Sequence, residues 1–175
     1  MSDVILILSL AAIFPLSMAY AVYSDLDHMK IPNWVSIAPA LAYLPIALLA
    51  DQTFAEIGLH YSAGIAMFTV AAVLFARGAM GGGDVKLLGA AAIWTGWDLL
   101  LPYLFLVAIF GGVLSIGALV LRRPFFSFLF RWLPWTNPAA APNVPYGVAI
   151  GLAAILLFPK LPSVSSAWAT LMSPL

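Results

Sequence analysis

The sequence predicts an all-α, polytopic membrane protein, a single domain built as a bundle of about six transmembrane helices. Hydrophobic residues make up 64% of the 175 residues and charged residues only 8%, whereas a soluble domain has about 45–50% and 25%. Several apolar runs approach the roughly 20 residues that a helix needs to cross a bilayer. The basic residues gather on one predicted side of the membrane, which agrees with the same topology.

Six helices account for the apolar runs. In chain order they are expected near residues 4–23, 34–50, 57–76, 85–97, 101–121 and 145–159. The first run follows Asp3 rather than a basic residue and is long enough to span, so it is interpreted as a retained helix and not as a cleaved signal peptide. A single helix over Val85–Leu121 would be about 55 Å long, almost twice the hydrocarbon thickness. A turn is therefore expected at Thr95–Asp98. Pro145 suits the first turn of the last helix, where its missing N–H costs nothing.

The basic residues test this topology, because Lys and Arg concentrate in cytoplasmic loops. With the N-terminus outside, the cytoplasmic side holds Lys30, Arg77, Lys86, Arg122, Arg123 and Arg131, and the outer side holds only Lys160. The long segment 122–144 then forms a cytoplasmic loop. Its aromatic stretch, 125–135, is typical of a segment in the headgroup layer, where it serves as a membrane anchor or as a surface that docks a substrate.

Composition excludes several functional classes. The chain has no cysteine, which excludes disulfides, thiolate metal sites and a cysteine nucleophile. His28 and His60 are too few and too far apart to suggest a zinc site. The formal net charge is zero, and no basic cluster is interleaved with aromatic residues, so nucleic-acid binding is not expected. We expect neither a metal nor a cofactor.

Two acidic residues are the candidates for chemistry, because ionisable groups near a membrane core are costly and usually functional. Asp25 follows the first apolar helix, where the helix dipole disfavours a carboxylate. Asp84 precedes the fourth helix. Each also has a purely structural interpretation: Asp25 as a solvated loop acid, and Asp84 as a helix N-cap. The predicted topology places both at the cytoplasmic boundary, at similar depth.

Two neighbouring carboxylates cannot both ionise easily, so they share a proton and titrate as a pair. The ionised member can take a proton from a water molecule that attacks a peptide carbonyl, while the protonated member polarises that carbonyl and then protonates the leaving amine. The pair Asp25 and Asp84 therefore predicts hydrolysis without a metal or a covalent nucleophile.

Four further residues support this hypothesis. Gly81 and Gly83 lack a Cβ and permit close approach of a substrate backbone. Lys86 is interpreted either as a ligand of lipid phosphate or as a charge that lowers the pKa of Asp84. Asp27 either replaces Asp25 or tunes its pKa.

The segments Asp25–Asn33 and Gly81–Leu88 resemble the two signatures of type IV prepilin peptidases. The family pattern is an Asp six residues before Ile-Pro-Asn, followed later by Gly-x-Gly-Asp, a Lys and apolar residues. Both pieces occur here in the same order and on the same predicted side of the membrane. Val144–Ile150 also looks like the start of the family's last helix.

The resemblance implies an endopeptidase of the bacterial inner membrane that removes the short basic leader of prepilins or pseudopilins at the cytoplasmic face. It implies catalytic roles for Asp25 and Asp84 and leaves Asp27 as a neighbour. The expected partners are membrane lipid and a substrate with a leader and a hydrophobic helix. The short length resembles the form associated with Flp-type, tight-adherence pili. Longer members carry an additional cysteine-containing segment and methylate the new N-terminus; that segment is missing, so methyltransferase activity and a bound zinc are not expected.

Two other functional classes stay open from the residues alone. Asp25 and Asp84 could bind cations or relay protons in a small ion- or proton-coupled transport protein, although no internal pseudo-symmetry supports this. The chain could also be a catalytically silent assembly protein of a pilus or secretion machine.

Overall fold

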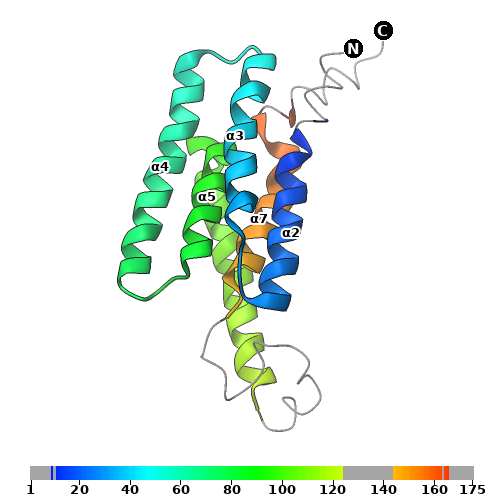
Figure 1. Ribbon diagram of the computed structural model, residues 1–175, viewed down its shortest axis with the longest axis vertical. Helices are drawn as coiled ribbons and strands as arrows, with labels where there is room; N and C mark the ends of the chain where they lie inside the picture. Colours follow the sequence, from blue (N-terminus) through cyan, green and yellow to red (C-terminus); the bar gives the residue numbers. More distant parts are fainter. Residues whose placement is uncertain (1–8, 10, 124–143, 163, 166–175) are drawn as a thin grey trace.

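The computed structural model describes residues 9, 11–123, 144–162 and 164–165, and this part of the chain is helical, without a β-strand (Figure 1). The elements are α2 (Ile13–His28), α3 (Asn33–Leu49), α4 (Phe54–Ala76), α5 (Gly82–Leu121), α7 (Tyr146–Leu157) and the short 3-10 helix η2 (Phe158–Lys160). The predicted all-α class is confirmed. The expected loop over 122–144 lies almost wholly outside the described residues.

Helix α5 is a hairpin of two helical arms. Gly96 interrupts it with φ 58° and ψ −171°, a conformation that glycine adopts far more readily than other residues. Figure 1 shows the first arm rising from Gly82 and the second running back along it. The expected turn at Thr95–Asp98 therefore corresponds to a break at one residue, with helical backbone on both sides. One glycine with positive φ reverses the chain, so no four-residue turn is needed.

His60 of α4 supports this break. Its Nδ1 lies 2.8 Å from the carbonyl oxygen of Ile93, one of the carbonyls left unpaired where a helix ends. A Cβ on Gly96 would lie 2.6 Å from Cε1 of the His60 ring. The reversal of α5 thus requires glycine for its backbone conformation and for its contact with His60.

Two helices in the described residues, α4 and α5, are long and apolar enough to cross a membrane, and α3 and α7 are shorter apolar helices. Large apolar side chains point outward from the bundle; Leu101 is 77% exposed and Leu119 is 69% exposed. Such a surface is unfavourable in water and favourable against lipid. The fold is consistent with a membrane protein, and the number of six spans stays a prediction.

Helix boundaries differ from the expected ones where local capping decides them. Helix α2 continues to His28 instead of ending near residue 23, because Met29 takes a left-handed conformation (φ 54°) and its N–H bonds to the carbonyl of Asp25 at 3.1 Å. Asp25 therefore lies inside the last turn of the helix and not after it. Helix α4 begins at Phe54 rather than 57, since Thr53 and Glu56 form a capping box.

Helices α2 and α7 pack through two glycines four residues apart. Gly147 and Gly151 both face α2, and a Cβ on Gly151 would lie 2.6 Å from Val22 Cγ2 and 2.9 Å from the carbonyl oxygen of Met18. Small residues at this spacing let two helix backbones approach closely, a common device in membranes. The close approach holds the end of α2, and Asp25 with it, against the start of α7.

Replacing Gly151 with alanine is expected to destabilise this contact. The added methyl group meets backbone atoms of α2, which cannot yield as a side chain can, and overpacking of this kind costs about 1–3 kcal/mol. Gly117→Ala is the matched control, because a Cβ there meets nothing within 4 Å; it is expected to stabilise α5 by about 0.5–1 kcal/mol. Thermal unfolding in detergent measures both changes. Equal shifts for the two variants would contradict the packing described here.

Candidate active site

Asp84 is positioned by the glycines that start α5. Gly81 is the N-cap of the helix, so Asp84 is its third residue and not the N-cap that the sequence suggested. From there the carboxylate reaches back to the N–H of Gly81, as the third residue of a capping box does. A Cβ on Gly81 would lie 2.9 Å from Asp84 Oδ2. A side chain at position 81 would therefore displace the carboxylate.

Asp25 is positioned by the meeting of α2 and α7. Its side chain is only 6% exposed, and the N–H groups of Gly147 and Val148 at the start of α7 face its carboxylate. The positive end of the α7 dipole thus offsets the unfavourable position of a carboxylate at the end of α2. The Oδ2 atom of Asp25 is buried and has no hydrogen-bond partner among the described residues. An unpaired buried oxygen costs stability and is typical of functional sites.

Ile31 packs between Gly83, which precedes Asp84, and Gly147, which lies beside Asp25. A Cβ on Gly83 would lie 3.1 Å from Ile31 Cβ, and a Cβ on Gly147 would lie 2.6 Å from Ile31 Cδ1. The connection between α2 and α3 is held in place by Ser24, whose hydroxyl donates to the carbonyl of Lys30 at 2.6 Å. The Ile-Pro-Asn segment therefore packs against the glycine motif of α5 on one side and α7 on the other.

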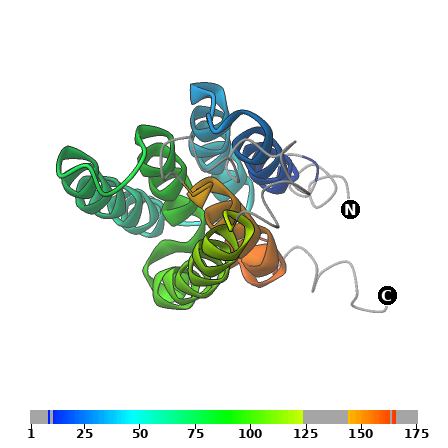
Figure 2. The ribbon, with the colours of Figure 1, turned by 90° about the horizontal axis from the view of Figure 1, so that it is seen from below.

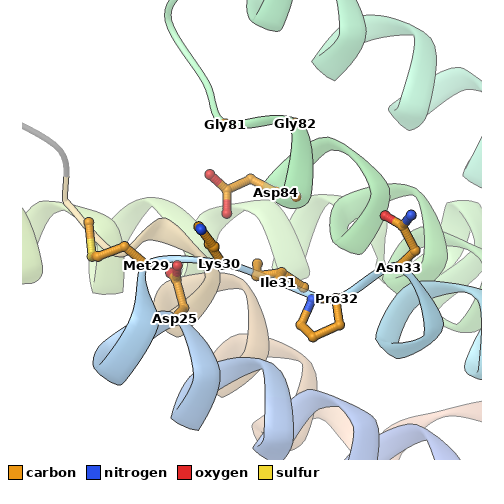
Figure 3. A pocket seen from close by; sticks show the side chains of 10 residues that line it. Asp25, Met29, Lys30, Ile31, Pro32, Asn33, Gly81, Gly82 and Asp84 are labelled. Carbon is orange, nitrogen blue, oxygen red and sulfur yellow. The ribbon is translucent and has the colours of Figure 1, made fainter.

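Both acids border the same open space (Figure 3). A cleft of about 530 Å³, here called the acid cleft, is lined by Asp25, Met29, Lys30, Ile31, Pro32, Asn33, Gly81, Gly82, Gly83 and Asp84. In Figure 3 the Asp25 side chain rises from α2, and the Asp84 side chain extends from the start of α5 on the opposite wall. A second hollow of about 560 Å³ adjoins it and is also lined by Asp25 and Asp84, together with Gly78 and Tyr146. The two carboxyl groups thus lie between two hollows.

The electrostatics of the site favour a shared proton. The apolar run of α2 stops at Tyr23 and that of α5 starts at Val85, so both carboxyl groups lie just outside the apolar stretches. Burial raises the pKa of Asp25 to about 6, and the N–H groups of α7 oppose this shift. Burial also raises the pKa of Asp84 to about 7, and the negative charge of Asp25 acts in the same direction. Two coupled acids with these pKa values keep one proton near neutral pH, the state needed to activate a water molecule.

The other candidate residues divide into two groups. Gly81 and Gly83 line the acid cleft; Gly81 lies against the Asp84 side chain and Gly83 against Ile31. Asp27 and Lys86 do not line it. Asp27 is 53% exposed and lies 3.4 Å from the Tyr23 hydroxyl and from Nδ1 of His28. The ammonium group of Lys86 donates to Asn33 Oδ1 at 2.8 Å and so joins α5 to α3.

Gly147 is the site residue that sequence reasoning missed. A Cβ there would lie 2.8 Å from Asp25 Oδ2 as well as against Ile31. The available signal was the glycine two residues after Pro145 at the head of an apolar run, but nothing in that pattern shows which helix it faces. Among the described residues, no group of three or more His, Cys, Asp or Glu side chains is arranged to hold a metal ion.

Fold and site together define an all-helical protein, consistent with a membrane location, that carries a buried acid, Asp25, and a half-buried acid, Asp84, on one cleft at the end of its bundle. The model of the type IV leader peptidase family matches residues 12–116, and the chain belongs to this family. The matched region includes both acids and both motifs. No curated protein and no solved structure matches the chain.

Proposed function

We propose that the protein is an aspartic endopeptidase that removes the leader peptide of Flp-type prepilins or pseudopilins at the cytoplasmic face of a bacterial inner membrane. The observation that carries the proposal is the placement of Asp25 and Asp84, from two different helices, on one cleft. Asp25 is buried and Asp84 is half-buried, and the charge of Asp25 affects Asp84. Membership of a leader peptidase family supports the reaction class.

In the proposed mechanism the pair holds one proton. The N–H groups at the start of α7 favour the charge on Asp25, so Asp84 carries the proton at rest. Asp25 takes a proton from a water molecule between the two groups as the water oxygen attacks the scissile carbonyl, and Asp84 donates its proton to the carbonyl oxygen. When the C–N bond breaks, the amine receives the proton held by Asp25. Asp84 takes back a proton from one hydroxyl group of the tetrahedral intermediate as the C=O bond reforms, and the leader leaves as a carboxylic acid. Both carboxyl groups then return to the shared state.

The proposed orientation places the N-terminus outside and the acid cleft on the cytoplasmic side. The positive-inside rule supports it, since Lys30, Arg77 and Lys86 all flank the end of the bundle that holds the acids. The substrate is then a chain whose leader lies at this face and whose apolar helix lies in the bilayer. N-methylation of the product is not part of the proposal.

Reconstitution with a purified Flp-type prepilin tests the function. Wild-type protein in liposomes is expected to release the leader, and mass spectrometry of both products identifies the cleaved bond. The same liposomes, loaded with a pH-sensitive dye, report proton flux. Acid-dependent flux without any cleavage would reject the peptidase in favour of a transport protein, and neither cleavage nor flux would favour a silent assembly protein.

The pH dependence of cleavage is expected to be bell-shaped. Activity requires one proton on the pair, so it falls at low pH as the second carboxyl group is protonated. It falls again as the pH rises above about 7, where Asp84 loses its proton. Initial rates of leader release between pH 4 and pH 9 measure the profile. A rate that keeps rising to pH 9 would indicate a different catalytic base and would contradict a shared proton.

A further inference from the structure

A second, apolar groove opens beside the acid cleft. It has a volume of about 280 Å³ and is here called the α3–α4 groove; its lining residues include Ser36, Ile37 and Ala40 of α3, Ile65 and Phe68 of α4, and Lys86, Ala90 and Ile93 of α5. The first arm of α5 lies between α3 and α4 (Figure 2). The hydroxyl of Tyr61 on α4 donates to the carbonyl of Ala40 at 2.8 Å and ties the two outer helices together.

The α3–α4 groove begins where the acid cleft ends. Asn33 lines the acid cleft, Lys86 lines the groove, and the two side chains are hydrogen-bonded at 2.8 Å. From Lys86 the groove follows α5 to Ile93, two turns further along the helix, which corresponds to a length of about 10 Å. It therefore leads from the level of the acids toward the middle of the bundle.

Ser36 brings an unpaired polar group to the lining of this groove. Its side chain is only 5% exposed, and its Oγ has no hydrogen-bond partner among the described residues. A buried hydroxyl without a partner is unfavourable in the free protein, and Ser36 lies in an otherwise apolar lining. A ligand with an apolar surface and a backbone N–H donor would match the apolar lining and supply the hydrogen bond that Ser36 Oγ lacks. The first turn of an apolar helix has this chemistry, because its first N–H groups have no partner within the helix.

We propose that the α3–α4 groove holds the first two turns of the substrate's apolar helix, directly after the scissile bond, and that Ser36 Oγ accepts a hydrogen bond from a backbone N–H of its first turn. This inference rests on the proposed function and extends it. The continuity of groove and acid cleft places the bond to be cut between Asp25 and Asp84 when the helix is seated. The helix also covers Ile65, which is 66% exposed in the free protein.

Ser36→Ala tests the hydrogen bond. Removal of an unpaired buried hydroxyl is not expected to destabilise the free protein. The KM for the prepilin is expected to rise by about 2- to 10-fold with kcat unchanged, as for the loss of one uncharged hydrogen bond. An unchanged KM with an unchanged unfolding temperature would overturn the role assigned to Ser36.

Photo-crosslinking tests the occupant. p-Benzoylphenylalanine replaces either Ile65 in the groove or Val70, an apolar residue of α4 that is 56% exposed and outside the groove lining. Five residues further along the helix, Val70 points to the far side of α4. Each variant carries Asp84→Asn to retain substrate and is reconstituted in liposomes with the Flp-type prepilin. We expect a crosslink from position 65 to the first two turns of the prepilin helix, at least 10-fold stronger than from position 70.

Three results would overturn the inference. Two of them leave the proposed function intact, and the third rejects the proposed function as well. Equal crosslinking from positions 65 and 70, or crosslinking of lipid alone from position 65, would reject the groove as the helix site while wild-type cleavage leaves the proposed function intact. Absence of cleavage by the wild-type protein in the same liposomes would reject the proposed function and the groove assignment together.

Discussion

Replacing either Asp25 or Asp84 with asparagine is expected to lower the rate of leader cleavage by at least about 1,000-fold. Asparagine keeps the size of the side chain but can neither take a proton from water nor donate one as an acid does. General acid–base catalysis contributes about 10²–10⁴-fold to a rate, and groups that act as one unit are lost together. The double variant is therefore expected to be no slower than either single variant. Single-turnover cleavage of the reconstituted prepilin measures all three.

Asp27→Asn is the matched control for these variants. Asp27 is an exposed acid two residues from Asp25, and it does not line the acid cleft. Its substitution is expected to change the rate by less than about 3-fold, the size of a weak surface interaction. Activity that survives in Asp25→Asn and disappears in Asp27→Asn would move the catalytic role to Asp27. Unfolding temperatures near that of the wild type establish that the inactive variants are folded.

Gly147→Ala is expected to reduce cleavage by about 100-fold. The added methyl group would lie 2.8 Å from Asp25 Oδ2 and 2.6 Å from Ile31 Cδ1, so the carboxyl group or the backbone of α7 must shift. A misplacement of about 1 Å in a catalytic group can cost 10²-fold in rate. The effect is expected in kcat rather than in KM, because the methyl group contacts Asp25 and not the α3–α4 groove.

A second variant separates the loss of packing from the loss of catalysis. Ile31→Ala in the Gly147→Ala background removes the Cδ1 atom that the methyl group meets, but leaves its contact with Asp25. Relief of the contact with Ile31 is expected to recover part of the unfolding temperature without recovering activity. Gly112→Ala, where a Cβ meets nothing within 4 Å, provides the control for a glycine substitution in a helix. Full activity of Gly147→Ala would show that the space beside Asp25 is not needed.

Several features of the site could be predicted from the sequence because they depend on local patterns. The apolar runs predicted the helices, and the distribution of Lys and Arg placed Asp25 and Asp84 at one end of the bundle. The structure has both acids on the same cleft. Asp25 is buried and Asp27, two residues further along α2, is 53% exposed. The catalytic role of Asp25 stays a prediction.

Other features depend on which helices are neighbours, and no local pattern contains that information. Gly147 contacts Asp25 only because α7 packs against α2. The bond between Lys86 and Asn33 and the open groove behind it arise from the arrangement of α3, α4 and α5. The sequence gives no direct sign of either. The start of α5 is a further example. Any of three successive glycines could be the N-cap of this helix, and the contact of the Asp84 carboxylate with the N–H of Gly81 favours Gly81, the first of them.

An infrared titration of the carboxyl groups tests the shared proton most directly. The absorption of a protonated carboxyl group is followed against pH in the wild type, in Asp25→Asn and in Asp84→Asn. In the wild type we expect one protonated group to persist to about pH 7. In Asp25→Asn burial still raises the pKa of Asp84, but the added effect of the negative charge of Asp25 is gone, so we expect Asp84 to lose its proton at a lower pH than in the wild type. An Asp84 titration that is the same with and without Asp25 would show that the two acids do not interact.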